Sequence, residues 1–287
     1  MTFARWAPIT LCAMVVAACG SSNQGQPPSD GAGSSTSTTA AAAGQAGETT
    51  GSGQMIVQYQ DATSPEAIAG KKIYQDQKML EDMADGMNFL LELPYDIPIV
   101  GMQCDAVNAS WNPELQQLVM CYEFIDDAEK TFAAAGAPDP LQRATDATVA
   151  VFFHEMGHMV IDIYDLPITG REEDVADQVA AFMLLQPGED DRVDAESVNV
   201  LLAMADLFDM WGQAAGDPDE AAYADEHSPD KVRVYNLLCW AFGADTDGNA
   251  VIVDEGWLPE DRAVKCEGEF DQINNSWITL LAPHLKE

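Results

Sequence analysis

The stretch VAVFFHEMGHMVI, residues 149–161, decides how the rest of the chain is interpreted. Apolar residues on both sides of the polar pentapeptide predict a helix that is buried on most sides, and Pro167 ends it soon afterwards. Residues four apart lie on one face of a helix, so His154 and His158 can direct an imidazole nitrogen to one point. Glu155 lies beside that point. This spacing predicts two ligands of a Zn²⁺ ion together with a carboxylate that can act as a base.

A third ligand is expected on a helix that begins near Gly170. Thr169 and Glu172 match a capping box, in which a hydroxyl and a carboxylate accept the free N–H groups of a helix start, and this gives Glu172 a structural role. Glu173 is then the expected ligand. Asp177 lies on the same face and is expected to accept a hydrogen bond from the far nitrogen of a ligating histidine. The plainer alternative is that these carboxylates only complement the helix dipole.

These two segments together resemble the gluzincin class of zinc metallopeptidases, in which a His-Glu-x-x-His helix precedes a helix with Glu-x-x-Ala-Asp, here residues 173–177. More closely, the chain resembles a bacterial metallopeptidase family whose substrates are not known. The matching segments are residues 121–123, 154–158, 170–178, 235–239, 258–263 and 280–283, with Trp277. The resemblance spans about Met55 to the C-terminus. It implies a zincin-like fold, a Zn²⁺ cofactor and hydrolysis of a peptide or protein substrate.

The N-terminus predicts export. Arg5 precedes an apolar run over residues 9–18, which is too short to span a bilayer and is typical of a secretory signal peptide. The sequence VAAC at 16–19 resembles the bacterial lipobox, which implies cleavage before Cys19 and lipidation of that residue. Ser21 then implies the outer membrane, facing the periplasm or the cell surface. The alternative is an ordinary signal peptide that happens to contain a cysteine.

Composition divides the chain into three parts. Residues 1–18 are the expected signal peptide, residues 19–54 a lipidated flexible linker without large apolar side chains, and residues 55–287 one domain long enough to bury a core. The 48 acidic and 13 basic residues give a net charge of −35. This charge excludes a phosphate-binding surface and argues against nucleic acid as a partner. Membrane contact is therefore expected through the lipid alone, and the chain is expected to be monomeric.

The hydrophobic pattern of the domain predicts an α+β, zincin-like fold: a small antiparallel sheet with a hairpin packs on the active helix, and the C-terminal half is mainly helical. The expected elements are a strand at 55–60, helices at 64–93, from about 140, from about 170, at 195–211, 229–242 and 259–281, and hairpin arms at 97–103 and 117–122. In known gluzincins an edge strand holds the substrate in extended form. The resemblance gives that role to residues 118–121, the alternative being a strand that only packs on the helix.

Four cysteines follow the signal peptide and Cys19, and an even number in an exported protein predicts disulfides. Three pairings are possible. Local pairing is favoured for Cys104 and Cys121, because they flank a turn sequence as opposed positions on a hairpin would. Cys239 and Cys266 then pair across a turn-rich loop between two helices.

A zinc peptidase also needs a donor for the oxyanion that forms when water attacks a carbonyl. His227 is the expected donor, with Asp225 as its partner; a surface loop histidine is the alternative, and Tyr164 and Tyr223 are weaker candidates. The sequence thus predicts a lipid-anchored zinc peptidase in which Glu155 deprotonates water. Two other hypotheses stay open: a non-catalytic lipoprotein that binds zinc through the same ligands, and an envelope interaction protein without a metal.

Overall fold

The computed structural model describes residues 53–188 and 192–286. The expected signal peptide, Cys19 and nearly all of the linker lie outside these residues. No helix in the described part is long and apolar enough to cross a bilayer.

The elements are β1 (Met55–Tyr59), α1 (Pro65–Gln77), α2 (Met79–Leu90), β2 (Ile97–Met102), β3 (Ala109–Asn112), β4 (Gln117–Cys121), α3 (Tyr122–Ala134), α4 (Pro140–Ile163), α5 (Glu172–Leu184), α6 (Ala195–Ala215), α7 (Glu220–Ala224), α8 (Asp230–Ala244), α9 (Val251–Asp254), α10 (Glu260–Ala263), α11 (Cys266–Leu281) and a 3₁₀ helix (Ala282–His284).

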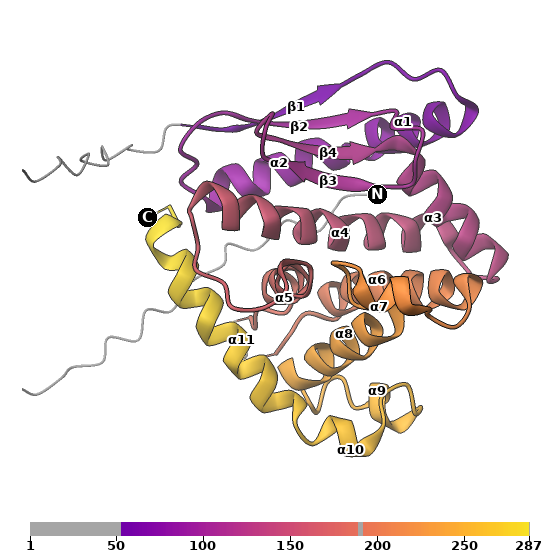
Figure 1. The fold of residues 1–287 in the computed structure, drawn as a ribbon, viewed down its shortest axis with the longest axis vertical. Helices are drawn as coiled ribbons and strands as arrows, with labels where there is room; N and C mark the ends of the chain where they lie inside the picture. The colour runs from indigo at the N-terminus through magenta and orange to yellow at the C-terminus, as the bar shows by residue number, and fades with distance from the viewer. Residues whose placement is uncertain (1–52, 189–191, 287) are drawn as a thin grey trace, which may run out of the picture. The chain divides into compact units, whose positions relative to one another are not determined.

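The four strands form one sheet in the order β1-β2-β4-β3 (Figure 1). The α+β class is confirmed, but the sheet is mixed: β1 and β4 run parallel to β2, and only β3 is antiparallel to β4. The expectation of an antiparallel sheet, with hairpin arms at 97–103 and 117–122, is therefore wrong. These two segments are β2 and β4, and both are buried on both faces, as inner parallel strands usually are. The hairpin joins β3 to β4.

The same topology corrects the expected substrate strand. β4 lies between β2 and β3 and has no open edge, so residues 118–121 cannot receive an added strand. The edge strands are β1 and β3, and β3 is the one that contacts α4. The N–H of Cys121 donates to the carbonyl of Asn108, and in an antiparallel pair this register turns the backbone groups of Ala109 and Trp111 to the outer side.

Two expected long helices are each broken in two. The predicted helix at 64–93 is α1 and α2, which meet at Lys78 in a left-handed conformation with φ 54°. The predicted helix at 259–281 is α10 and α11. The first break lets α1 pack on α3 while α2 packs on β1 and β2. Apolar periodicity continues across both breaks, so the sequence pattern does not reveal them.

Helix α4 is the centre of the fold. It begins as expected at Pro140, where the side chain of Asp139 accepts the backbone N–H of Gln142, and it runs 24 residues. One side contacts β3 and β4, and other sides contact α3, α5 and α6 (Figure 1). Because α4 is packed on nearly all sides, the side chains of its polar pentapeptide are held in fixed positions.

Two disulfides close the pairs that the sequence favoured, Cys104–Cys121 and Cys239–Cys266. The first does not cross a hairpin. Cys121 is paired with Met102 of the parallel neighbour β2, and Cys104 follows two residues later. The second bond joins α8 to α11. The first bond therefore holds the segment after β2 to the end of β4, and the second holds two C-terminal helices together.

Replacing both Cys239 and Cys266 with alanine is expected to lower the free energy of unfolding by about 3 kcal/mol, because the bond closes a loop of 27 residues in the unfolded chain. Urea denaturation followed by tryptophan fluorescence measures this loss. The Cys104/Cys121 double variant, with a separation of 17, should lose a similar amount. An unchanged urea midpoint in either variant would contradict the expectation.

Candidate metal centre

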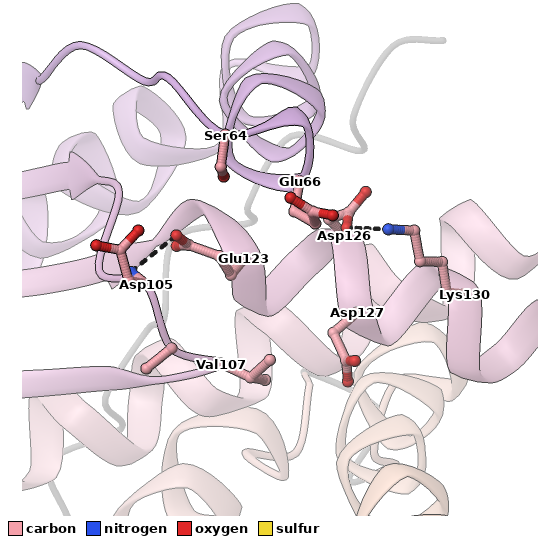
Figure 2. Close-up of a pocket in the computed structure, with 9 residues that line it drawn as sticks. Ser64, Glu66, Asp105, Val107, Glu123, Asp126, Asp127 and Lys130 are labelled. Atoms are coloured by element: carbon pink, nitrogen blue, oxygen red, sulfur yellow. Dashed lines mark hydrogen bonds and ion pairs between the residues drawn. The ribbon is translucent and has the colours of Figure 1, made fainter.

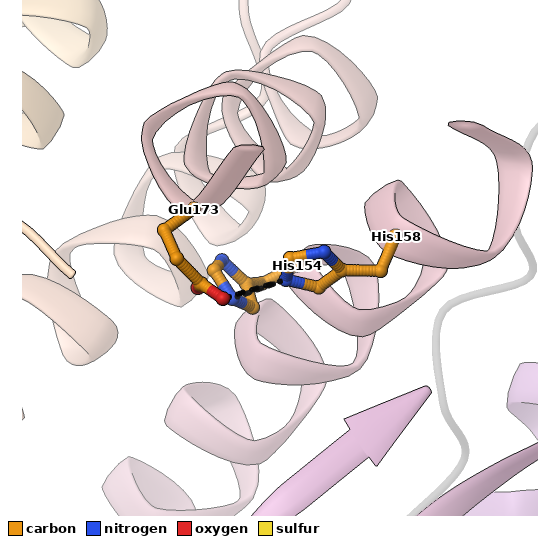
Figure 3. A group of neighbouring side chains, drawn as sticks. All are labelled: His154, His158 and Glu173. Atoms are coloured by element: carbon orange, nitrogen blue, oxygen red, sulfur yellow. Dashed lines mark hydrogen bonds and ion pairs between the residues drawn. The ribbon is translucent and has the colours of Figure 1, made fainter. Parts of the chain in front are cut away.

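Helices α4 and α5 bring the three expected ligands together. The two helices approach closely because Gly157 has no side chain: a Cβ there would lie only 3.0 Å from the Cα of Ala176. Figure 3 shows His154 and His158 from α4 turned toward Glu173 at the start of α5. Glycine in the pentapeptide and alanine in the second motif therefore set the distance between the ligand-bearing helices.

Two imidazole nitrogens and the Glu173 carboxylate lie about as close together as zinc ligands do, each nitrogen beside a different carboxylate oxygen. Nε2 of His154 lies 3.1 Å from Oε2 of Glu173, Nε2 of His158 lies 3.4 Å from Oε1, and the two Nε2 atoms lie 3.3 Å apart. Zinc bonds of about 2.0–2.1 Å at tetrahedral angles place neighbouring ligand atoms about 3.3–3.4 Å apart. These three residues can thus hold one metal ion, and they form one of two such groups among the described residues.

The far nitrogen of each histidine meets a carboxylate. Nδ1 of His154 lies 2.8 Å from Oδ1 of Asp177, the partner that the sequence proposed. Nδ1 of His158 lies 2.8 Å from Oε1 of Glu172. The expected capping box is wrong: Arg171 occupies the cap position and no side chain caps the helix. The Glu172 carboxylate reaches across to α4 rather than back to the backbone, and it fixes a histidine ring as the outer partners of metal sites do.

Asp177 has a further partner that sequence reasoning missed. Arg233 on α8 donates from Nε to Oδ2 over 2.8 Å and from Nη2 to Oδ1 over 2.7 Å. Both side chains are buried. Burial alone would raise the pKa of Asp177, but the Arg233 guanidinium and, after it, His154 lower this pKa to about 2. The only sequence signal was a lone arginine among the apolar residues of a predicted helix.

Glu155 is buried between α4 and the edge strand. Its Oε2 accepts the backbone N–H of Trp111 over 2.9 Å. The indole Nε1 of the same residue donates to Asp162, so Trp111 fastens β3 to α4 in two places. A pocket of about 590 Å³ is lined by β3, by the histidines and by Glu155. Trp111 was not identified from the sequence, because no local pattern connects it with residues more than forty positions away.

His227 lies at the same site. Its Nε2 is 3.0 Å from Oε2 of Glu173, and its Nδ1 is 3.1 Å from Asp225, the proposed partner. The hydrogen bond to Glu173 and, more weakly, that to Asp225 raise the pKa of His227. Tyr164 instead donates its hydroxyl to the carbonyl of Glu92. Neither Tyr164 nor Tyr223 lines the pocket, whereas His227 does.

A second pocket, of about 360 Å³, lies by the start of α3 (Figure 2). Two of its carboxylates have partners within the fold. Glu123 accepts the backbone N–H groups of Cys104 and Asp105, and Asp126 pairs with Lys130. Neither of the two groups able to hold a metal among the described residues includes a residue of this pocket.

Zinc affinity should fall as the pH falls from about 9 to 6. Burial by itself lowers the pKa of His154, but hydrogen bonds with Asp177 and Glu173 raise it to about 9. A ligating imidazole must be neutral, so zinc has to displace this proton, and the apparent Kd should rise about tenfold per pH unit below 9. Chelator competition at several pH values measures the Kd, and calorimetry in two buffers counts the released proton. A Kd that does not change with pH would contradict this expectation.

Comparison with known protein families assigns this chain to one of them. The sequence model of a family described as "Putative metallopeptidase" matches residues 59–281, from the end of β1 to the end of α11. The chain belongs to this family. Membership supports a metal-dependent peptidase role at the level of the family, and it confirms the family resemblance found in the sequence. A search of curated proteins and a search of solved structures each found no match.

Proposed function

We propose that this protein is a zinc-dependent peptidase of the gluzincin class, with His154, His158 and Glu173 as the zinc ligands. The short separations among the two Nε2 atoms and the Glu173 carboxylate carry the proposal. Zinc, when bound, polarises the scissile carbonyl and makes a water molecule nucleophilic near neutral pH. Asp177 orients His154, and Glu172 orients His158, through their far nitrogens.

Glu155 is the proposed general base. It adjoins His154 in the chain and faces the pocket, and its Oε2 is held by the Trp111 N–H. Its other oxygen is then available to take a proton from the attacking water and to deliver it to the leaving amine. A site that only binds metal needs no base, so a carboxylate that holds Trp111 with one oxygen and also faces the pocket favours catalysis over the binding alternative.

β3 is the proposed substrate strand. Its open edge carries the outward backbone groups of Ala109 and the outward carbonyl of Trp111, whose N–H is already donated to Glu155, and both residues line the pocket. An extended peptide can pair with such an edge through main-chain hydrogen bonds, independently of its side chains. Trp111 therefore links the substrate strand with Glu155, so that a peptide bound to β3 and the base keep fixed positions relative to each other.

His227 is the proposed oxyanion donor. Its Nε2 lies beside the Glu173 carboxylate, and Asp225 holds both its Nδ1 and its backbone N–H. Because both ring nitrogens face carboxylates, which raise its pKa, the protonated imidazole of His227 has an N–H on Nε2 that it can donate to a carbonyl oxygen as that oxygen gains negative charge. This role explains why the loop before α8 reaches the site.

Metal analysis and a peptide library test the proposal together. Purified protein should contain about one zinc per chain, lose it to a strong chelator together with peptide hydrolysis, and regain both on addition of zinc. His154→Ala should abolish metal retention. Zinc-loaded protein that cleaves no member of a diverse library would favour the zinc-binding lipoprotein, and protein that retains no metal would exclude both.

We further propose that Cys19 is lipidated and holds the enzyme in a bacterial cell envelope, at the outer membrane. The sequence VAAC at 16–19 supports this placement. Expressed in a bacterium and labelled with a fatty-acid probe, the full chain should carry the label and fractionate with membranes. Cys19→Ser should remove the label; label retained in that variant would reject the assignment.

A further inference from the structure

We infer that Arg233 is a positioning residue of the metal centre: it locks the Asp177 carboxylate in the orientation that makes His154 present Nε2 to the metal. The inference rests on the proposed zinc site and extends it to the C-terminal helices, which contribute no expected ligand. Three helices take part, since Arg233 is on α8, Asp177 on α5 and His154 on α4.

The geometry leaves Asp177 no freedom. Its two oxygens receive Nε and Nη2 of Arg233 at 2.8 and 2.7 Å, a paired arrangement that fixes the plane of the carboxylate. The same Oδ1 lies 2.8 Å from Nδ1 of His154. The Asp177 residue is 1% exposed and Arg233 is 7% exposed, so water does not compete for these bonds.

The hydrogen-bond roles follow from the chemistry of arginine. A guanidinium has donors only, so both Asp177 oxygens act as acceptors toward Arg233. Oδ1 then faces Nδ1 of His154 as an acceptor, so in the neutral form that binds a metal the proton is on Nδ1 and the lone pair is on Nε2. Nε2 is the atom that faces Glu173. A paired guanidinium thus selects both the tautomer and the ring orientation that a metal requires.

Arg233 is itself held in place. Its guanidinium carbon lies 4.0 Å from the centre of the Phe208 ring on α6, a cation–π contact in the core. The side chain therefore cannot turn away from Asp177 without losing this contact. It also means that substitutions at Arg233 will cost stability, so stability alone cannot test the inference.

Zinc affinity and metal spectroscopy provide the test. Arg233→Gln should still bind one zinc per chain but with a Kd raised about 10- to 100-fold, the usual effect of removing an outer partner of a metal ligand. The visible spectrum of the Co²⁺-substituted protein should also change, because the ring orientation of His154 changes. Lys231→Gln is the matched control: Lys231 lies two residues away and pairs with Asp209 outside the site, so Kd and spectrum should stay as in the parent chain.

A double-mutant comparison separates positioning from general packing. Asp177→Asn should weaken zinc binding, and adding Arg233→Gln to it should change the Kd by less than about threefold, because the arginine acts through Asp177. Arg233→Lys keeps the charge but loses the planar pair of donors, so its zinc Kd should lie between those of the parent chain and Arg233→Gln. It replaces Arg233→Gln in these measurements if the glutamine variant does not fold.

Two results would overturn the inference: a folded Arg233 variant with unchanged zinc affinity and Co²⁺ spectrum, or full additivity of the two substitutions. If the proposed peptidase activity is absent, the measurements give a different set of results. A parent chain that binds zinc but cleaves nothing would remove hydrolysis and leave the Arg233 effect on the Kd measurable, whereas a parent chain that binds no zinc would overturn both.

Discussion

Glu155→Gln is expected to lower kcat by about 10²- to 10⁴-fold while the protein keeps one zinc per chain. Glutamine has the same shape, and its amide oxygen can still accept the Trp111 N–H that Oε2 of Glu155 accepts over 2.9 Å. The amide cannot take a proton from water. Because Glu155 is not among the three expected ligands, metal content should not change.

The measurement pairs a fluorogenic peptide assay with metal analysis of the same sample. Glu267→Gln, an exposed carboxylate on α11, is the matched control and should keep both activity and zinc. Because substrate binding involves the β3 edge rather than Glu155, KM should change little in Glu155→Gln. Hydrolysis that persists at the parent rate would remove Glu155 as the base, and loss of zinc would mean that this carboxylate contributes to ligation.

Local spacing explains what the sequence predicted well. The histidines of α4 are four residues apart, and Glu173 and Asp177 are four residues apart on α5, so helix geometry alone orders each pair. Bringing the two helices together still depended on Gly157, whose missing side chain admits Ala176. Gly157 belongs to the motif, but its role in packing could be recognised only once the positions of both helices were known.

Long-range contacts explain what the sequence did not predict. Arg233 reaches Asp177 across 56 positions, and Trp111 reaches Glu155 across 44, so no local window contains either pair. The predicted antiparallel pairing of residues 97–103 with 117–122 was wrong because β2 and β4 are both apolar, and their pattern is the same for parallel and antiparallel neighbours. Cysteine pairing was predictable because only three pairings existed and both pairs were local.

The role of Glu172 shows how a correct local rule can fail. Thr169 and Glu172 have the spacing of a capping box, and the rule considers only backbone donors in the same segment. In the folded chain Oε1 of Glu172 lies 2.8 Å from Nδ1 of His158, which is on the neighbouring helix α4. The tertiary partner replaces the local one, and it makes two adjacent glutamates parts of one centre.

Substitution of these two glutamates should therefore weaken zinc binding to very different extents. Glu173→Gln is expected to raise the zinc Kd by more than about 10²-fold, because it replaces a charged ligand with a neutral amide. It also removes the hydrogen bonds that join Glu173 to His154, His158 and His227, which hold the pKa of Glu173 far below its usual range against the effect of burial.

Glu172→Gln is expected to raise the Kd by only about 10-fold, since it alters a partner of His158 rather than a ligand. The side chain of Glu172 is 52% exposed, so water can take over its hydrogen bond, whereas that of Glu173 is 15% exposed. Chelator competition at one fixed pH compares the two variants, each of which removes one negative charge. Equal losses would show that net charge near the histidines governs affinity, and a larger loss in Glu172→Gln would transfer the ligand role to Glu172.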